Sequence, residues 1–120
     1  MTKALVVEDN SLNRELIFEL VTECGFIVDT AVNGEEAVKK AQNEVYDLII
    51  MDIELPGMDG VAAARLIRSK PDHEKTPVIA LTSYAMYGDR ERFLGEGFNE
   101  YVPKPINVDD FEELLKKYKK

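Results

Sequence analysis

Apolar runs and amphipathic segments alternate along the whole chain. The apolar runs are short, which is typical of strands, and the segments between them carry apolar residues at helical spacing. The predicted strands are Ala4–Val7, Ile27–Ala31, Leu48–Met51, Val78–Leu81 and Glu100–Val102. This regular alternation of strands and helices predicts an α/β fold with a parallel sheet.

The helical segments begin at residues whose side chains can cap the first turn, namely Asn10 or Ser11, Asn33, Asp59 and Asn107. The first helix ends at Gly25, the second near Asn43 and the third before Pro71. The segment Met86–Gly95 predicts only a weak helix, because it contains Gly88 and few apolar positions. In the first helix, apolar residues recur at helical spacing at Leu12, Leu16, Ile17, Leu20, Val21 and Cys24. The buried face expected for the third helix consists of Ala63, Leu66 and Ile67. The buried face expected for the last helix consists of Phe111, Leu114, Leu115 and Tyr118.

Three of the predicted strands are apolar throughout, whereas the second and the fifth mix polar with apolar residues. In a parallel sheet that helices cover on both faces, the fully apolar strands are central and the mixed strands form the edges. This pattern agrees with a doubly wound sheet of five strands in the order 2-1-3-4-5. Right-handed crossovers then place the functional crevice at the carboxyl ends of the first and third strands.

Polar residues follow the apolar strands at the end where this crevice is expected. Glu8 and Asp9 end the first strand, and Asp52 ends the third. Thr82 ends the fourth strand, and Lys104 follows the fifth. Because the carboxyl ends of parallel strands meet at one rim, we expect these five side chains to converge.

The predicted rim combines acids with an ammonium group and a hydroxyl. Three carboxylates in one crevice repel one another unless a cation joins them, and oxygen ligands of this kind suit Mg²⁺. Asp52, at the centre of the set, is placed to attack phosphorus and form an aspartyl phosphate. Lys104 can neutralise one phosphoryl oxygen, and the Thr82 hydroxyl can donate a hydrogen bond to another.

Four segments of the chain resemble the receiver domains of two-component signalling. They are VVEDNSLNR, LIIMDIELPGMDG, ALTSYA and YVPKPI, which stand in the order and spacing of that family from about Lys3 to Tyr118. The resemblance implies one receiver domain over residues 1–120 with a flavodoxin-like, CheY-like fold. The EDN run followed by Asn13 and Arg14 is most similar to receivers of hybrid kinases and to single-domain regulators of the DivK type.

The resemblance also implies roles in phosphoryl transfer and in switching. Asp52 is the expected phosphoacceptor, and Lys104 and Thr82 are expected to bind the phosphoryl group. Tyr101, three residues before the lysine, matches the aromatic switch position that works with Thr82. A cis bond between Lys104 and Pro105 is expected to aim the lysine inward.

A metal site is implied at the same rim. Asp9 and Asp52 are the expected direct ligands of Mg²⁺, with Glu8 acting largely through water and the backbone carbonyl of Glu54 as a further ligand. Tyr84 is bulky enough to cover the approach of water to phosphorus, and the Glu54 side chain can point away. We therefore expect a switch that loses its phosphoryl group slowly and is not a turnover enzyme.

Composition narrows the choice of partners. The chain has 120 residues, a net charge of -8 and a pI near 4.7, which oppose binding to nucleic acid. No segment is long enough to span a membrane, and the lone Cys24, expected in the core, fits a reducing, cytoplasmic location. His73, the only histidine, is expected to be solvated in a polar loop.

The expected partners are proteins. A sensor histidine kinase or a histidine phosphotransfer protein would donate the phosphoryl group. A downstream protein would bind the face formed by the fourth helix, the fifth strand and the fifth helix. Met1 and the lysine-rich finish favour a complete, stand-alone regulator, expected to be a monomer, with no room for a DNA-binding helix pair.

Three other functions are compatible with parts of the pattern. A haloacid-dehalogenase-like phosphatase also uses an aspartyl phosphate, but Leu55 and Pro56 follow Glu54 where a Thr or Ser is needed, and turnover of a phosphate ester would identify it. A flavodoxin-like FMN carrier needs a Ser/Thr-rich phosphate loop where this chain has EDN, and it would be coloured. An adaptor that has lost phosphorylation conflicts with the intact set of acids.

Overall fold

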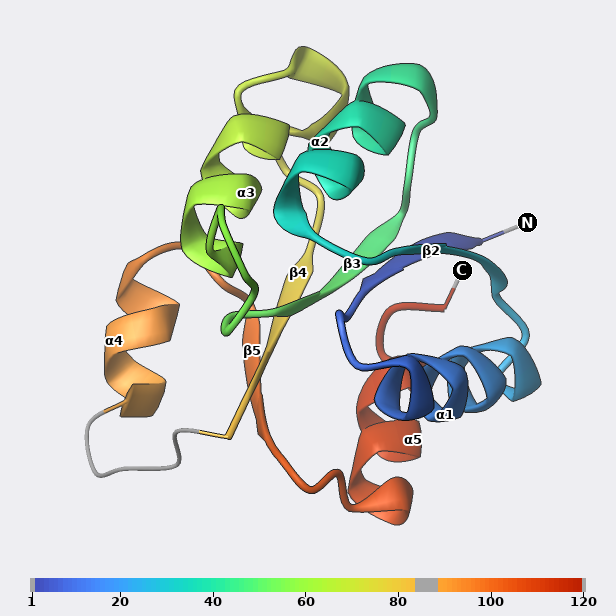
Figure 1. The fold of residues 1–120 in the computed structure, drawn as a ribbon. Helices are drawn as coiled ribbons and strands as arrows, with labels where there is room; N and C mark the ends of the chain where they lie inside the picture. Colours follow the sequence, from blue (N-terminus) through green and yellow to red (C-terminus); the bar gives the residue numbers. More distant parts are fainter. Residues whose placement is uncertain (1, 84–88, 120) are drawn as a thin grey trace.

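The computed structural model describes residues 2–83 and 89–119, in which five strands alternate with helices (Figure 1). The strands are β1 (Lys3–Val7), β2 (Ile27–Ala31), β3 (Leu48–Asp52), β4 (Val78–Thr82) and β5 (Glu100–Pro103). The helices are α1 (Ser11–Glu23), α2 (Gly34–Asn43), α3 (Gly60–Arg68), α4 (Asp89–Gly95) and α5 (Val108–Lys116), with a short 3₁₀-helix, η1, at Pro71–His73. The predicted alternation is confirmed. The expected start of the fourth helix at Met86, and Gly88 with it, lie outside the described residues.

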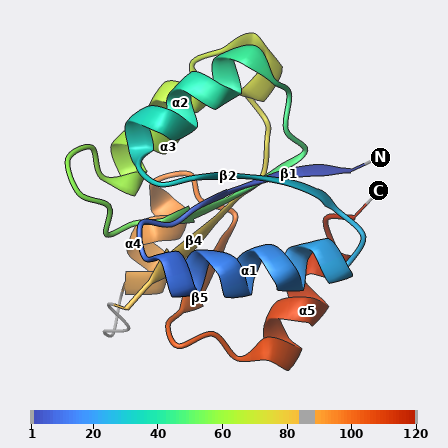
Figure 2. The same ribbon diagram turned by 45° about the vertical axis from the view of Figure 1, so that its right-hand side comes forward.

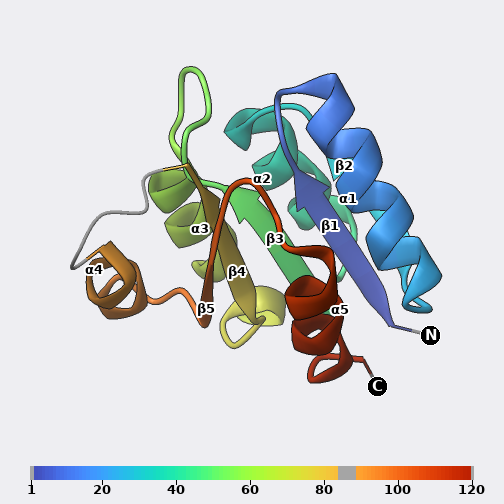
Figure 3. The same ribbon diagram turned by 90° about the horizontal axis from the view of Figure 1, so that it is seen from below.

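The five strands form one parallel sheet in the order β2-β1-β3-β4-β5, which confirms the predicted order (Figure 3). β3 and β4 are buried along their whole length, and β1 is buried apart from its first residue. β2 and β5 keep partly exposed residues, as expected of edge strands. The distinction between fully apolar and mixed strands therefore located the centre and the edges of the sheet.

Helices cover both faces of the sheet. α2 and α3 lie together on one face and α1 and α5 on the other, while α4 lies beside β5 at the edge (Figures 1 and 2). Alternate residues of β1 supply two separate cores, because successive side chains of a strand point to opposite faces. Leu5 and Val7 belong to the core under α2 and α3, which Phe93 of α4 joins. Ala4 and Val6 belong to the core under α1 and α5.

Four helices begin at the capping residues that the sequence indicates. The side chains of Asn10, Asn33, Asp59 and Asn107 each accept a hydrogen bond from the backbone N–H three residues later, at 2.8–3.0 Å. Each such cap stabilises a helix start by about 1 kcal/mol. None of the helices in residues 2–83 and 89–119 is long and apolar enough to cross a membrane.

Leu66 corrects one expected helix face. Its side chain is 46% exposed, and α3 instead buries Gly60, Ala63, Ala64 and Ile67. The small residues of that stripe let α3 approach the sheet closely, and Leu66 falls beside the stripe. In α1 the leucines Leu12 and Leu16 share the apolar spacing, but they are exposed, and Ile17, Leu20 and Val21 form the buried face.

The remaining expected core positions are confirmed with different depths. Phe111 and Leu115 of α5 are buried. Leu114, Tyr118 and Cys24 are partly buried and pack against the same core. Burial raises the pKa of the Cys24 thiol.

The prediction of a solvated His73 is wrong. His73 ends η1 with no exposed surface, and its ring stacks on Tyr46 with the ring centroids 6.2 Å apart. Its Nε2 accepts a hydrogen bond of 3.1 Å from the backbone N–H of Tyr46, which lies just before β3. A buried backbone donor needs a partner, and the imidazole supplies it. Burial lowers the pKa of His73, and a proton on Nε2 would also remove the acceptor.

We predict that His73 makes the fold less stable in mild acid. The pKa of His73 is lower in the folded protein than in the unfolded chain. The stability that the neutral ring contributes is therefore fully present above the unfolded pKa, and it is lost as the pH falls from that value to the folded pKa. Between pH 7.5 and pH 5.5 wild type should lose about 1 kcal/mol more unfolding free energy than His73→Gln, which has no titrating ring. Urea titrations at both pH values measure the difference. Parallel pH profiles for the two proteins would contradict this assignment.

Candidate functional site

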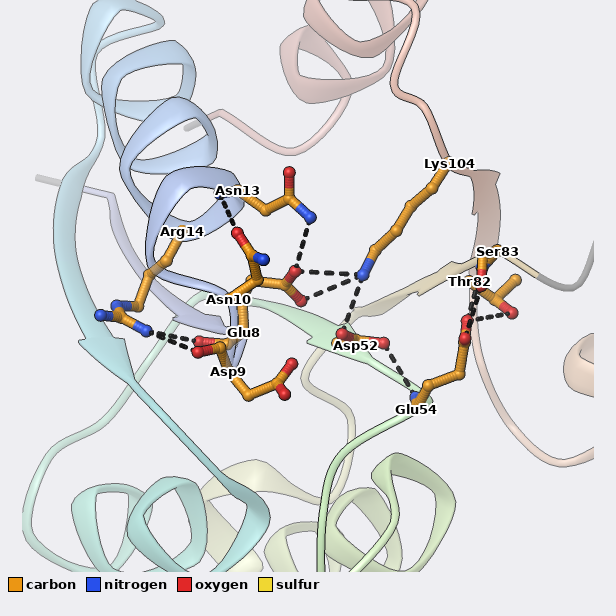
Figure 4. Close-up of polar contacts among 10 residues, drawn as sticks. All are labelled: Glu8, Asp9, Asn10, Asn13, Arg14, Asp52, Glu54, Thr82, Ser83 and Lys104. Atoms are coloured by element: carbon orange, nitrogen blue, oxygen red, sulfur yellow. Dashed lines mark hydrogen bonds and ion pairs between the residues drawn. The ribbon is translucent and has the colours of Figure 1, made fainter.

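Side chains from four strand ends meet at the carboxyl edge of the sheet (Figure 4). Glu8 and Asp9 follow β1, and Asp52 ends β3. Lys104 follows β5, and its side chain reaches back to Glu8 and Asp52. Thr82 ends β4 and is buried at the same edge. The convergence predicted from the sequence is therefore present in the structure.

Lys104 connects the two buried acids. Its Nζ lies 2.9 Å from Asp52 Oδ2, and 3.1 and 3.2 Å from the two carboxylate oxygens of Glu8. The Lys104–Pro105 peptide bond is cis, as expected. The backbone N–H of Lys104 donates to the Thr82 carbonyl at 2.8 Å, which ties the lysine to the end of β4. One ammonium group thus neutralises part of the charge of two carboxylates that come from different strands.

Asp52 is held in a fixed position at the centre of this edge. Its side chain has almost no exposed surface, and Oδ1 accepts a hydrogen bond of 2.8 Å from the backbone N–H of Glu54. Gly60, at the start of α3, lies directly against its backbone. A Cβ at Gly60 would be 2.4 Å from the Asp52 carbonyl oxygen, so a larger residue would displace the strand end. Gly60 was not among the predicted site residues, although it follows Asp59 at the predicted helix start.

The three acids of the rim form a possible cation site. Glu8, Asp9 and Asp52 each offer a carboxylate oxygen, and these atoms lie within 4.8 Å of one another. Glu8 and Asp52 are buried and Asp9 is exposed, so the cluster is open to solvent on one side. Hard oxygen donors in this number, with room for water, fit Mg²⁺.

The proximity of the charges changes their pKa values. The pKa of Glu8 is raised to about 7, first by burial and then by the neighbouring Asp52 carboxylate. Burial also acts to raise the pKa of Asp52, but the contacts with Glu8 and Lys104 outweigh it, and the pKa is lowered. Burial acts to lower the pKa of Lys104, and its contacts with the two acids raise it on balance. Of the two buried acids, Asp52 therefore loses its proton more readily.

Glu54 turns its side chain away from the acids and towards the end of β4 (Figure 4). Its Oε1 accepts hydrogen bonds from Thr82 Oγ1 at 3.0 Å and from the backbone N–H of Ser83 at 2.5 Å. Its Oε2 accepts a third, from Ser83 Oγ at 2.5 Å. Burial acts to raise the pKa of Glu54, but these hydrogen bonds outweigh it and the pKa is lowered. Neither these contacts nor a role for Ser83 was predicted from the sequence.

Tyr101, the expected switch residue, packs on α4. It is partly buried, and its ring stacks on that of Phe93 with the centroids 5.7 Å apart. Phe93 in turn meets the ring of Phe98 edge-on. The tyrosine is thus part of an aromatic group that joins β5 to α4.

Two residues of α1 support the acids that precede it. Asn13 Nδ2 donates to Glu8 Oε1 at 3.1 Å. Arg14 donates from its guanidinium to the backbone carbonyls of Glu8, at 2.9 Å, and Asp9, at 3.3 Å. In the sequence, Asn13 and Arg14 indicated only a resemblance to a subgroup of the family. Their place in the first turn of a helix that follows two acids was the signal for a supporting role.

Comparisons with known proteins agree with this arrangement. Residues 4–116 match the family described as response regulator receiver domain. The chain is 41% identical over 115 residues to the signal transduction histidine-protein kinase BarA of Escherichia coli. The matched region covers 96% of the chain but only 12% of that kinase. It is 39% identical to the polar-differentiation response regulator DivK of Brucella anthropi, with 95% of the chain and 93% of the relative covered.

A solved structure of similar size is equally close. The response regulator TrrA of Thermotoga maritima, crystallised in complex with Mg²⁺–BeF, is 42% identical, with a TM-score of 0.86 and coverage of 99% of this chain and 100% of that one. The chain thus matches both nearly whole regulators and a small part of a histidine-protein kinase. Its fold, its acidic edge and its sequence all agree that it belongs to the response regulator receiver domain family.

Proposed function

We propose that this receiver domain accepts a phosphoryl group on Asp52 with the help of Mg²⁺ and passes the signal on through protein–protein contact. The observation that carries the proposal is the bridge from Lys104 Nζ to Asp52 and Glu8, beside the exposed Asp9. A buried, anionic carboxylate next to one fixed cation is suited to attack phosphorus. A phosphohistidine on a sensor kinase or on a histidine phosphotransfer protein is the proposed donor.

The transfer needs positioning and charge neutralisation. An Asp52 carboxylate oxygen forms the new P–O bond while the P–N bond of the phosphohistidine breaks, and the imidazole leaves with the electron pair. Lys104, which contacts Asp52 before the reaction, would follow the charge to a phosphoryl oxygen. The Thr82 hydroxyl would donate to another. Thr82 and Lys104 are joined by a backbone hydrogen bond, so they would act as one unit.

Mg²⁺ would be held by Asp9 and Asp52, by Glu8 largely through water, and by the backbone carbonyl of Glu54. When bound, the ion would neutralise the charge that carboxylates and phosphoryl group share. The geometry of the acids favours a bound Mg²⁺, because one carboxylate oxygen of each lies within 4.8 Å of the others in a cluster with one exposed member. The TrrA structure carries Mg²⁺ by its printed description, which supports the same cofactor for this chain.

We further propose that the domain is a switch with slow loss of its phosphoryl group and not a turnover enzyme. Hydrolysis needs a water in line with the phosphorus. The Glu54 carboxylate points away from Asp52 towards Thr82 and Ser83, and after transfer its negative charge would be repelled by the phosphoryl oxygens, which disfavours a position from which it could orient that water. Tyr84, the other residue expected to shield the phosphorus, lies outside the described residues.

The output surface that we propose is the face of α4, β5 and α5. A groove of about 370 Å³ lies between β5 and α5, and Tyr101, Phe111 and Leu114 are among its lining residues. A change in the position of Tyr101 would therefore alter the shape of this groove directly. A protein target that binds there would sense the state of Asp52. We propose a cytoplasmic monomer, with kinase or phosphotransfer protein and target binding in turn.

We predict that Asp52 is the phosphoacceptor. With a small acyl-phosphate donor and Mg²⁺, wild type should gain one phosphoryl group by intact mass and lose it over many minutes. Asp52→Asn should gain none, because the amide is not a nucleophile of this kind. Asp59→Asn is the matched control, since it lies in the same loop and keeps its helix cap. A hydroxylamine-labile phosphate on Asp52→Asn at the wild-type rate would refute the assignment.

We predict that Mg²⁺ stabilises the folded domain through the acidic cluster. At about ten times its dissociation constant, Mg²⁺ should raise the free energy of unfolding by about 1.4 kcal/mol, because it binds the folded acids and not the unfolded chain. The gain should be much smaller in Asp9→Ala. Thermal unfolding with and without Mg²⁺ measures both. Glu19→Ala, which removes the same charge from an exposed position on α1, should keep the full gain. Equal gains in Asp9→Ala and wild type would argue against this site.

We predict that a phosphoryl mimic on Asp52 changes the face of α4, β5 and α5. Addition of Mg²⁺–BeF should shift backbone amide signals in α4, β5 and α5 as well as around Asp52, because Thr82 would turn to the added group and allow Tyr101 to move. Two-dimensional NMR of labelled protein measures these shifts. Tyr101→Ala should reduce the distant shifts and keep those near Asp52. Shifts confined to the Asp52 pocket in wild type would exclude this mode of switching.

A further inference from the structure

The Glu54 carboxylate is the acceptor for three hydrogen-bond donors at the end of β4. They are the hydroxyl of Thr82 at 3.0 Å, the backbone N–H of Ser83 at 2.5 Å and the hydroxyl of Ser83 at 2.5 Å. Thr82 has no exposed surface, so its hydroxyl is directed by protein groups and not by bulk water. An internal anion therefore engages the donors of this strand end (Figure 4).

The same donors lie next to the proposed phosphoacceptor. β3 and β4 are neighbours with Asp52 opposite Leu81, and the backbone N–H of Ile53 donates to the Leu81 carbonyl at 2.9 Å. Thr82 and Ser83 follow Leu81, which places them beside the end of β3. A phosphoryl group on Asp52 would bring strong oxygen acceptors to this point. A hydroxyl has a single hydrogen to donate, so Thr82 serves either Glu54 or the phosphoryl group well, and not both.

We propose that Glu54 is a positioning residue that holds Thr82 and Ser83 in the resting state, as an internal substitute for the phosphoryl group, and that phosphorylation must displace it. The inference rests on the proposed function of Asp52 as acceptor. It adds a competing resting state, which Glu54 stabilises. A ligand that binds only when Glu54 is released has a lower apparent affinity. The affinity is reduced in proportion to the fraction of molecules in which Glu54 does not contact Thr82 and Ser83.

Length and charge of residue 54 have separable effects on this contact. Glu54→Ala removes both the charge and the acceptor. Glu54→Asp keeps the charge but is shorter by one methylene group, so it cannot reach both Thr82 and Ser83. Ser83→Ala removes one of the three hydrogen bonds and leaves the residue 54 charge, the Thr82 hydroxyl and the backbone N–H in place. Ser83 is exposed, so this variant is expected to fold.

The experiment is calorimetric titration of each folded protein with Mg²⁺–BeF, the ligand in the TrrA complex. We expect Glu54→Ala to bind roughly tenfold more tightly than wild type, Glu54→Asp nearly as tightly as Glu54→Ala, and Ser83→Ala roughly threefold more tightly than wild type. Equal or weaker binding by Glu54→Ala overturns the proposal. Wild-type affinity in Glu54→Asp also overturns it, because charge repulsion alone would then explain the effect of alanine.

A second measurement reports the contact itself. The Ser83 amide proton, which donates to a carboxylate in wild type, should resonate far downfield in NMR spectra and move upfield in Glu54→Ala and Glu54→Asp. An unchanged Ser83 signal in Glu54→Ala refutes the contact whatever the affinities are. Failure of wild type and all variants to bind Mg²⁺–BeF would overturn the proposed function, and this inference with it. Binding by wild type with no gain in the Glu54 variants would overturn this inference alone.

Discussion

The ammonium group of Lys104, placed between Asp52 and Glu8, is the interaction on which the acidic edge depends. Two carboxylates with almost no exposed surface lie side by side there, and burial of each charge costs several kcal/mol unless a partner compensates. Lys104 provides part of that compensation, and the pKa of Glu8, raised to about 7, makes the charge of that acid easier to lose. Asp9 adds a third carboxylate to the cluster. The edge is thus stable enough to fold and retains an excess of negative charge, which favours a divalent cation.

The position of this edge follows from regularities that a sequence expresses locally. Continuous apolar runs such as Val78–Leu81 indicate buried central strands, and the polar residues that follow them must lie at one rim when all strands are parallel. Glu8, Asp52 and Lys104 could be brought together by this reasoning although 96 residues separate the first from the last. The helix starts could be predicted equally well, because a capping residue such as Asp59 accepts a hydrogen bond from a residue only three positions away.

What could not be foreseen depends on one side chain meeting another distant group. His73 is buried because the Tyr46 N–H, 27 residues away, needs an acceptor, and nothing in the local run of polar residues records that need. Leu66 is exposed because it lies beside the buried stripe of α3, which consists of Gly60, Ala63, Ala64 and Ile67. Glu54 has the right type and spacing for several roles. Its contact with Thr82 was decided by the relative placement of two strand ends and not by the sequence around it.

These contacts suggest how a small event at Asp52 would reach a distant surface. Thr82 pairs with Pro103 across β4 and β5, two residues beyond Tyr101 on the same strand. Tyr101 stacks on Phe93 and so connects β5 to α4. In proteins, most of the stability of a helix comes from packing of this kind. A change in the partner of the Thr82 hydroxyl would therefore act beside the strand whose Tyr101 packs on α4.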